Sequence, residues 1–193
     1  MSIALNLKDE PRDTYIRDTI ARVCPCAESV LDVGCGLSLQ SRYIDADRRV
    51  GLDIYKPFLD KIETDVPYTA VNADALDIDK FYAPESFDVV LVLDMIEHLD
   101  KDTGYRLLEI VEQVAKRLVY ITTPRGFTPQ NIDLWECNGH EYQTHRSGWF
   151  PEEFTERGYW VTERGYTMRD IKRHDLWRVE PDVRVINAML LKP

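Results

Sequence analysis

The sequence has no long hydrophobic run, and no stretch approaches the roughly 18 consecutive apolar residues that a membrane-spanning helix requires. The opening stretch MSIALNLKDEPRD also lacks a basic segment followed by an apolar one. This argues against a secretory signal peptide. We therefore expect a cytoplasmic protein with no membrane partner.

The cysteines are too few and too badly spaced to form a structural site. There are 4 of them, and Cys24 and Cys26 are separated by a single residue. That spacing is too short for an easy disulfide and differs from the Cys-x-x-Cys pattern of zinc sites. Cys35 and Cys137 lie far apart in the sequence. Reduced thiols without a bound metal are the simplest interpretation.

Basic charge is also scarce. The chain carries 24 Lys and Arg against 34 Asp and Glu, for a net charge of −10. Sequence-independent nucleic-acid binding depends on clustered Lys and Arg, so the balance argues against a nucleic-acid partner. The one basic cluster, in residues 164–178, is interpreted as a solvated helix face. A length of 193 residues suits a single domain with one core.

The most informative pattern present is VLDVGCG at residues 30–36, followed by VGLDI ending just after Asp53. An apolar run, then a Gly-x-Gly turn, is typical of a parallel strand that passes into a helix beneath a nucleotide. Gly34 and Gly36 allow a sharp turn and close approach of a ligand. A carboxylate at the tip of the next strand suits the two hydroxyls of a ribose. The pattern indicates a bound adenosine.

Strand and helix patterns alternate along the first two thirds of the chain. Expected strands cover residues 30–33, 48–53, 68–71, 87–93 and 118–122, and expected helices cover residues 9–23, 38–45, 57–63 and 100–116. This alternation predicts an α/β fold with a doubly wound, Rossmann-like parallel sheet and helices on both faces. A long loop over 124–151, a helix over 151–157 and strands over 159–167 and 184–192 complete the expected single domain. Residues 1–27 form an expected N-terminal helical cap.

The motifs together resemble those of class I S-adenosylmethionine-dependent methyltransferases, over roughly residues 28–193. VLDVGCG resembles the first family motif, GLDI the second and NADALD the third. FDVVLVLDMIEHL resembles the fourth strand and its exit, in the form of the quinone-biosynthesis-like branch. The family pattern would place a third glycine at Ser38. The resemblance implies a seven-stranded sheet that is mostly parallel, with the last strand antiparallel.

The resemblance also implies a cofactor, S-adenosylmethionine, released as S-adenosylhomocysteine. Gly34 and Gly36 would line its methionine part, Asp53 would accept both ribose hydroxyls, and Asp74 would accept from the adenine amine. The full implied cofactor set is Asp32, Gly34, Cys35, Gly36, Asp53, Ile54, Asp74, Ala75, Asp94 and Met95. Each member also has a simpler explanation as a turn glycine, helix cap or loop acid.

Methyl transfer from a sulfonium is an in-line displacement in which the protein mainly supplies position and desolvation. An oxygen acceptor also needs a base, for which histidine is well suited near neutral pH. The candidates are His98, in IEHL after the fourth strand, and His140 and His145 in the long loop. Simpler alternatives are structural roles beneath the cofactor or within the loop. Glu97 is expected to hold the turn.

Several further residues could serve the acceptor. Arg125 and Arg146 could pair with an anionic substrate, or be ordinary surface arginines. Trp135, Tyr142 and Trp149 could wall a pocket, or be aromatic core under the loop. No metal site is expected, since Asp94 alone does not establish one.

The leading hypothesis is an enzyme that methylates a small molecule, with oxygen as the favoured acceptor atom. Two alternatives stay open: a protein that binds S-adenosylmethionine or its product without turnover, and a nicotinamide-dependent oxidoreductase, whose Gly-x-Gly turn and following acid are similar. The sequence also leaves a homodimer open.

Overall fold

The computed structural model describes residues 12–38, 44–131, 133, 136–166 and 183–192. The helices are α1 (Arg12–Val23), α2 (Lys56–Leu59), α3 (Ile78–Phe81), α4 (Lys101–Val114) and α5 (Pro151–Thr155), with 3-10 turns η2 (Ala75–Asp77) and η3 (Ile96–His98). The strands are β1 (Ser29–Val33), β2 (Arg48–Asp53), β3 (Thr69–Asn72), β4 (Phe87–Leu93), β5 (Ala115–Pro124), β6 (Trp160–Tyr166) and β7 (Val183–Leu191).

The strands form one seven-stranded sheet in the order β3-β2-β1-β4-β5-β7-β6. The first five strands pair in parallel, while β7 pairs antiparallel with both β5 and β6. The predicted fold class is confirmed, including the antiparallel last strand. The chain order reverses between β1 and β4, which is where ligands bind in sheets of this type.

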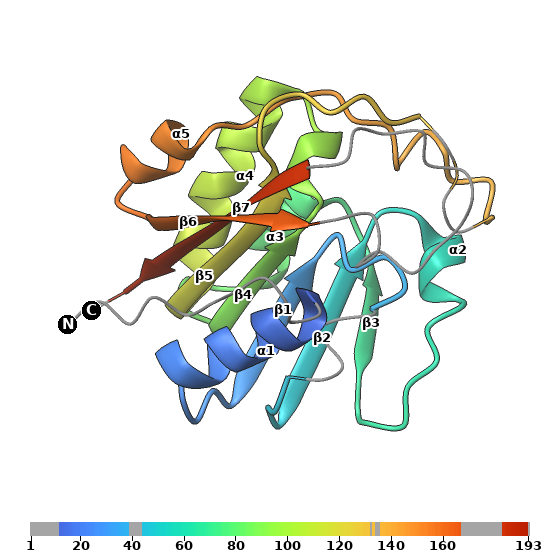
Figure 1. Ribbon diagram of the computed structural model, residues 1–193. Coiled ribbons are helices and arrows are strands. Elements are labelled where there is room, and N and C mark those ends of the chain that lie inside the picture. The colour runs from blue at the N-terminus through green and yellow to red at the C-terminus, as the bar shows by residue number, and fades with distance from the viewer. Residues whose placement is uncertain (1–11, 39–43, 132, 134–135, 167–182, 193) are drawn as a thin grey trace.

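Two buried layers hold the sheet between its helices (Figure 1). Every residue of β4, FDVVLVL, is buried, as expected of a central strand covered on both faces. On one face Ile16 and Ile20 of α1 pack with Val89 and Leu91. On the other face α4 contributes an apolar stripe to the larger core: Leu107, Leu108, Ile110, Val111 and Val114. Because β1 to β5 pair in parallel, their carboxyl ends lie along the same edge of the sheet.

Several helices differ from expectation. The helix expected over 38–45 falls mostly on residues 39–43, which lie outside the described part, and Ile44 and Asp45 are not helical. The helix expected over 57–63 is the four-residue α2, which begins at Lys56. The turns η2 and α3 were not expected, because each is too short to show a helical period. Among the described residues, no helix is long and apolar enough to cross a membrane.

Asp88 joins the start of β4 to the start of β1. Its carboxylate accepts hydrogen bonds from the backbone N–H groups of Glu28 and Ser29 at 2.8 and 3.1 Å, and from the Ser29 hydroxyl at 3.2 Å. Burial raises the pKa of Asp88, but these hydrogen bonds outweigh burial and the pKa lies below its ordinary value. The ionised carboxylate therefore stabilises the fold.

Replacing Asp88 with asparagine should lower the free energy of unfolding by about 1–2 kcal/mol near pH 7, because a charged acceptor of three hydrogen bonds is lost. A lowered folded-state pKa contributes stability above the unfolded pKa of about 4, and this contribution disappears as the pH falls through the folded value. Urea unfolding of Asp88→Asn and wild type should thus converge at acidic pH. Asp79→Asn, at an exposed carboxylate of α3, is the control. A difference that does not change with pH would contradict this role.

Candidate active site

The acids predicted to line the ligand edge lie on consecutive strands. Asp32 is in β1 and pairs in register with Gly51 of β2, and Asp53 ends β2 opposite Asn72 of β3. Asp74 lies two residues after the end of β3, and Asp94 follows β4 directly. All four therefore belong to the carboxyl ends of neighbouring parallel strands, where the sequence placed them.

The Gly-x-Gly segment forms a left-handed turn that only glycine adopts easily. The φ angles of Gly34 and Gly36 are +68° and +52°. A Cβ atom at Gly34 would come within 2.1 Å of Met95 Cγ, so the turn packs directly against the exit of β4. Ser38 stands where the family pattern has a third glycine, and its φ is +54°. The backbone thus keeps the glycine-like conformation although the side chain is serine.

Asp53 is buried and fastens this turn to the tip of β2. Its Oδ2 accepts a hydrogen bond from the N–H of Gly36 at 2.9 Å, and its Oδ1 accepts one from the N–H of Tyr55 at 2.8 Å. Burial raises the pKa of Asp53, and the two hydrogen bonds oppose that rise. Since each carboxylate oxygen has two lone pairs, the group can hold the turn and still accept a further donor.

The other cofactor candidates have varied surroundings. Asp74 is exposed, and its Oδ1 accepts from the N–H of Leu76 at 2.9 Å, which caps η2. Ala75 and Asp32 are buried, whereas Ile54 is 51% exposed at the edge. Burial raises the pKa of the Cys35 thiol well above its ordinary value, so this cysteine stays protonated inside the glycine turn. Whether these residues contact a cofactor remains a prediction.

Asp94 turns the chain sharply at the end of β4. Its φ is +47°, its N–H donates to the carbonyl of Thr122 at 2.9 Å, and its Oδ1 accepts from the Thr122 hydroxyl at 2.9 Å. These contacts fix the start of the segment that carries Met95, Glu97 and His98. The exit of β4 is therefore held against β5 and, through Met95, against the glycine turn.

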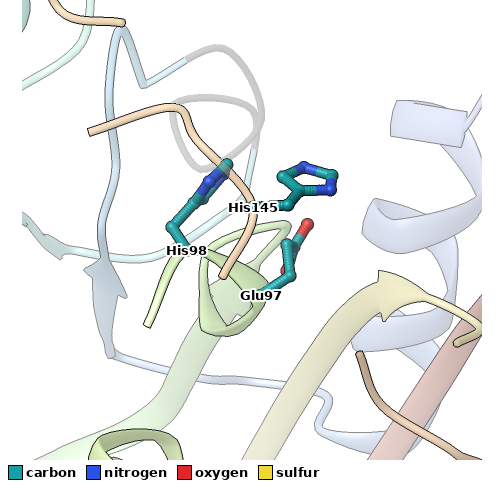
Figure 2. A group of neighbouring side chains, drawn as sticks. All are labelled: Glu97, His98 and His145. Carbon is teal, nitrogen blue, oxygen red and sulfur yellow. The ribbon is translucent and has the colours of Figure 1, made fainter. Parts of the chain in front are cut away.

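Two of the three candidate histidines meet beside Glu97 (Figure 2). The ring centroids of His98 and His145 are 4.9 Å apart, and one potential ligand atom from each histidine and one from Glu97 all lie within 4.8 Å of one another. His98 Nδ1 lies 3.2 Å from the carbonyl of Thr144, and His145 Nδ1 lies 2.5 Å from the carbonyl of Thr128. His140 is exposed and is not part of this group.

Both histidines of this group favour the neutral form. Burial, followed by the nearby His145 ring, lowers the pKa of His98 to about 4. Burial also lowers the pKa of His145. The carboxylate of Asp94 and the hydrogen bonds to backbone carbonyls oppose both shifts without overcoming them. Near neutral pH the two rings are therefore unprotonated bases.

The long segment after β5 covers this edge of the sheet and reaches α2, as the yellow and orange trace in Figure 1 shows. Tyr55 after β2 donates its hydroxyl to the carbonyl of Cys137 at 2.8 Å, and its ring stacks on Tyr142 at 4.7 Å. At the other end, the N–H groups of Arg146 and Ser147 donate to the carbonyl of Glu97 at 2.8 and 3.1 Å. The segment thus bridges the ends of β2 and β4.

The remaining acceptor candidates are engaged within the protein. Arg125 pairs with Glu163 at 2.9 Å, and Arg146 donates to the carbonyl of His98 at 2.7 Å. Trp149 is fully buried in the core, while Trp135 lies outside the described residues. A cavity of about 480 Å³ lies between α1 and the amino ends of β1 and β2. It is at the opposite edge and contains none of the predicted site residues.

Residues 31–122 match the family model described as a methyltransferase domain. The match runs from β1 to β5 and so contains the glycine turn, Asp53, Asp74 and the exit of β4. This part of the chain is therefore similar to a methyltransferase domain. No curated protein sequence matches the chain.

Similar solved structures cover nearly the whole chain. One is a SAM-dependent methyltransferase from Archaeoglobus fulgidus, 20% identical, with 92% of this chain and 94% of that chain covered and a TM-score of 0.56. A second is phosphoethanolamine N-methyltransferase 2 from Haemonchus contortus, solved with phosphomonomethylethanolamine and S-adenosylhomocysteine, at 16% identity, 94% and 52% coverage and a TM-score of 0.63. A third is magnesium protoporphyrin IX methyltransferase from Synechocystis PCC 6803 with bound S-adenosylhomocysteine, at 15% identity, 92% and 81% coverage and a TM-score of 0.59.

These likenesses confirm the fold. Together with the family match over residues 31–122, they confirm the predicted enzyme class, a methyltransferase that depends on S-adenosylmethionine. The methyl acceptors named for the similar structures differ from one another, so the fold does not select an acceptor.

Sequence reasoning missed two residues that shape the site. Asn72 donates its side-chain amide to the carbonyls of Asp53 and Ile54 at 3.0 and 2.8 Å, and so fixes the edge of β2. Its place at the end of β3, two residues before Asp74, is the signal that could have suggested this. Glu97 was assigned only to holding the turn. Its position beside two histidines depends on the fold of a loop almost fifty residues later, for which the sequence offers no rule.

Proposed function

We propose that this chain transfers the methyl group of S-adenosylmethionine to an oxygen atom of a small molecule. The observation that carries the proposal is the glycine turn fastened to Asp53, packed through Met95 against the segment that holds His98. This arrangement supports a cofactor site on one side of Met95 and a basic group on the other. The form of the motif after β4 supports placement in the quinone-biosynthesis-like branch.

The cofactor would lie along the carboxyl ends of β1, β2 and β3. In this proposal Gly34 and Gly36 let the methionine part approach the backbone, and Asp53 accepts the ribose hydroxyls. Asp74 and Ala75 contact adenine, and Ile54, which is 51% exposed, provides an apolar surface for the base. The carboxylates along this edge also attract a sulfonium cation.

The reaction would be a displacement at the methyl carbon. The acceptor oxygen forms a bond to the methyl group, the bond from methyl to sulfur breaks, and its electron pair stays on the sulfur of S-adenosylhomocysteine. The proton of the acceptor hydroxyl passes to a neutral histidine, for which His145 is the best placed residue. Its Nδ1 lies against the carbonyl of Thr128, which can only accept, so the lone pair is on Nε2.

The segment 124–151 would form the acceptor side of the site as its cover. It joins Tyr55 near the cofactor edge to Glu97 near the histidines, so it spans the region in which an acceptor must lie. The net charge of −10 supports a small-molecule acceptor over a nucleic acid.

Replacing Asp53 with alanine should weaken binding of S-adenosylmethionine by about 1.5–3 kcal/mol, or roughly 10- to 150-fold in Kd, because a charged acceptor is lost. Loss of the anchor between Gly36 and Tyr55 acts in the same direction. Calorimetric titration of the variant and wild type with S-adenosylmethionine, S-adenosylhomocysteine and NAD measures this directly. Asp60→Ala, at an exposed carboxylate just after α2, is the matched control.

An unchanged affinity in a folded Asp53→Ala protein would remove this residue from the site. Tight binding of NAD with none of S-adenosylmethionine would overturn the proposed function. Cofactor binding without transfer of a labelled methyl group to any member of a broad acceptor panel would instead favour a sensor or scaffold.

A further inference from the structure

The group formed by Glu97, His98 and His145 has the composition of a metal site. Glu97 and His98 belong to η3 after β4, and His145 comes from the covering segment 124–151. Figure 2 shows the three side chains gathered at one place. We propose that this group binds a divalent transition-metal ion. The role of the ion rests on the proposed function: it holds the acceptor oxygen beside the methyl group.

Both histidines are oriented as metal ligands usually are. His98 Nδ1 and His145 Nδ1 each lie against a backbone carbonyl, of Thr144 and Thr128. A carbonyl oxygen only accepts, so each hydrogen bond places the proton on Nδ1 and the lone pair on Nε2. A hydrogen bond from the second ring nitrogen is the usual way in which proteins fix the tautomer and direction of a ligating histidine. The nitrogen left to bind a metal is therefore Nε2 in both residues.

Glu97 supplies a carboxyl group that is removed from water. The residue is only 2% exposed, and its Oε2 accepts a hydrogen bond from the Thr123 hydroxyl at 2.9 Å. The Thr123 contact orients the carboxylate as outer hydrogen bonds orient metal-bound carboxylates in general. A cation at this place would have one carboxylate oxygen and two imidazole nitrogens within reach.

The backbone holds the three groups together before any ion arrives. The carbonyl of Glu97 accepts from the N–H groups of Arg146 and Ser147, directly after His145. The Arg146 guanidinium donates to the carbonyl of His98 at 2.7 Å. These hydrogen bonds hold the two segments together next to the ligand group, which reduces the ordering that metal binding would require.

The set of ligand atoms indicates the class of metal. Two imidazole nitrogens and one carboxylate oxygen suit zinc, iron, cobalt or manganese, whereas magnesium and calcium prefer oxygen ligands. Three protein ligands leave coordination positions open, as in catalytic rather than structural sites. An open position can take an acceptor hydroxyl, and the charge of the ion favours loss of its proton. The histidines would then act as ligands, and the ion would replace the histidine base.

The ion would also be near the methyl group in the proposed function. Met95 lies two residues before Glu97 and packs on Gly34 of the cofactor turn. If the three side chains only stabilised the fold, no specific metal binding would be expected from them. Metal affinity therefore separates the proposal from a purely structural edge-to-face pair of histidines.

The test is a metal titration of the whole chain after removal of bound metals with a chelator. We expect the wild type to bind one equivalent of Co²⁺, which is measured by its visible absorption. It should also bind one equivalent of Zn²⁺, which is measured by competition with Co²⁺. His145→Ala and Glu97→Gln should each weaken binding at least about tenfold, since even outer-shell changes cost that much. His140→Ala, which removes an exposed histidine of the same segment, should bind metal as the wild type does. Circular dichroism checks that each variant is folded.

Absence of saturable binding by the wild type would overturn the proposal, as would equal affinity in all four proteins. The titration uses neither cofactor nor acceptor, so its result is independent of the proposed function. Metal binding without any binding of S-adenosylmethionine would leave the ion site standing and reject the methyltransfer role. Cofactor binding without metal binding would leave the methyltransfer role standing and reject the ion site.

Discussion

Replacement of His145 with alanine should lower turnover by about 10²- to 10⁴-fold, the usual contribution of a positioned group that assists proton transfer. The same loss is expected whether the imidazole takes the proton itself or holds an ion that promotes its departure. Affinity for S-adenosylmethionine should change little, because His145 comes from the covering segment and the predicted cofactor residues lie on the strand ends. Steady-state transfer of a labelled methyl group, with a separate cofactor titration, measures both effects.

His140→Ala should have a smaller effect on turnover, because His140 is exposed and outside the group formed with Glu97. The comparison is informative because the two histidines are five residues apart in one segment. Equal losses in both variants would point to general disturbance of the segment 124–151. Full activity of a folded His145→Ala protein would remove this residue from the chemistry.

A Gly34→Ala variant should lose about 2–4 kcal/mol of unfolding free energy. A left-handed conformation costs a non-glycine residue about 1–2 kcal/mol, and overpacking adds a further 1–3 kcal/mol. Here the φ is +68°, and the new Cβ would lie 2.1 Å from Cγ and 3.0 Å from Cβ of Met95. Both atoms are close to the Met95 backbone, so a rotation at the far end of the side chain cannot relieve the contact. Cofactor affinity should fall as well, since the turn must move.

Gly165→Ala is the matched control for this substitution. A Cβ at Gly165, in β6, would meet nothing within 4 Å. Urea unfolding should therefore give a stability close to that of wild type for Gly165→Ala and a clear loss for Gly34→Ala. Equal stabilities in the two variants would show that the turn accommodates a side chain.

Much of the fold follows from local patterns in the sequence. The buried run FDVVLVL predicts β4 with its exact bounds, and the helical spacing of Leu107, Leu108 and Val111 predicts α4. The glycine turn is equally local, since the glycines of VLDVGCG predict a turn with positive φ angles and VGLDI predicts the strand that ends at Asp53. These features depend on neighbours in sequence, which periodicity can detect.

The failures involve contacts between distant residues or very short elements. The turns η2 and α3 span three and four residues, which is too few for an amphipathic period. The interpretation of Glu97 was incomplete because its neighbour His145 belongs to a segment whose described residues form no helix or strand between β5 and α5. Asp53 was expected to bind a ribose or to be a loop acid, and neither interpretation included its hydrogen bonds to the N–H groups of Gly36 and Tyr55, which depend on the geometry of two strand ends.

The place of β7 between β5 and β6 affects how the chain can fold as it is made. Residues 183–191 come after both neighbours in the sequence, and β6 pairs with no other strand among the described residues. A nascent chain that has emerged only as far as β6 presents β5 as an open edge, a surface that invites pairing with other chains. The sheet can therefore be completed only after β7 has been made, because β7 lies between β5 and β6 but follows both in the sequence. The parallel half with the cofactor turn can assemble earlier, so the two halves of the sheet have different exposure to aggregation.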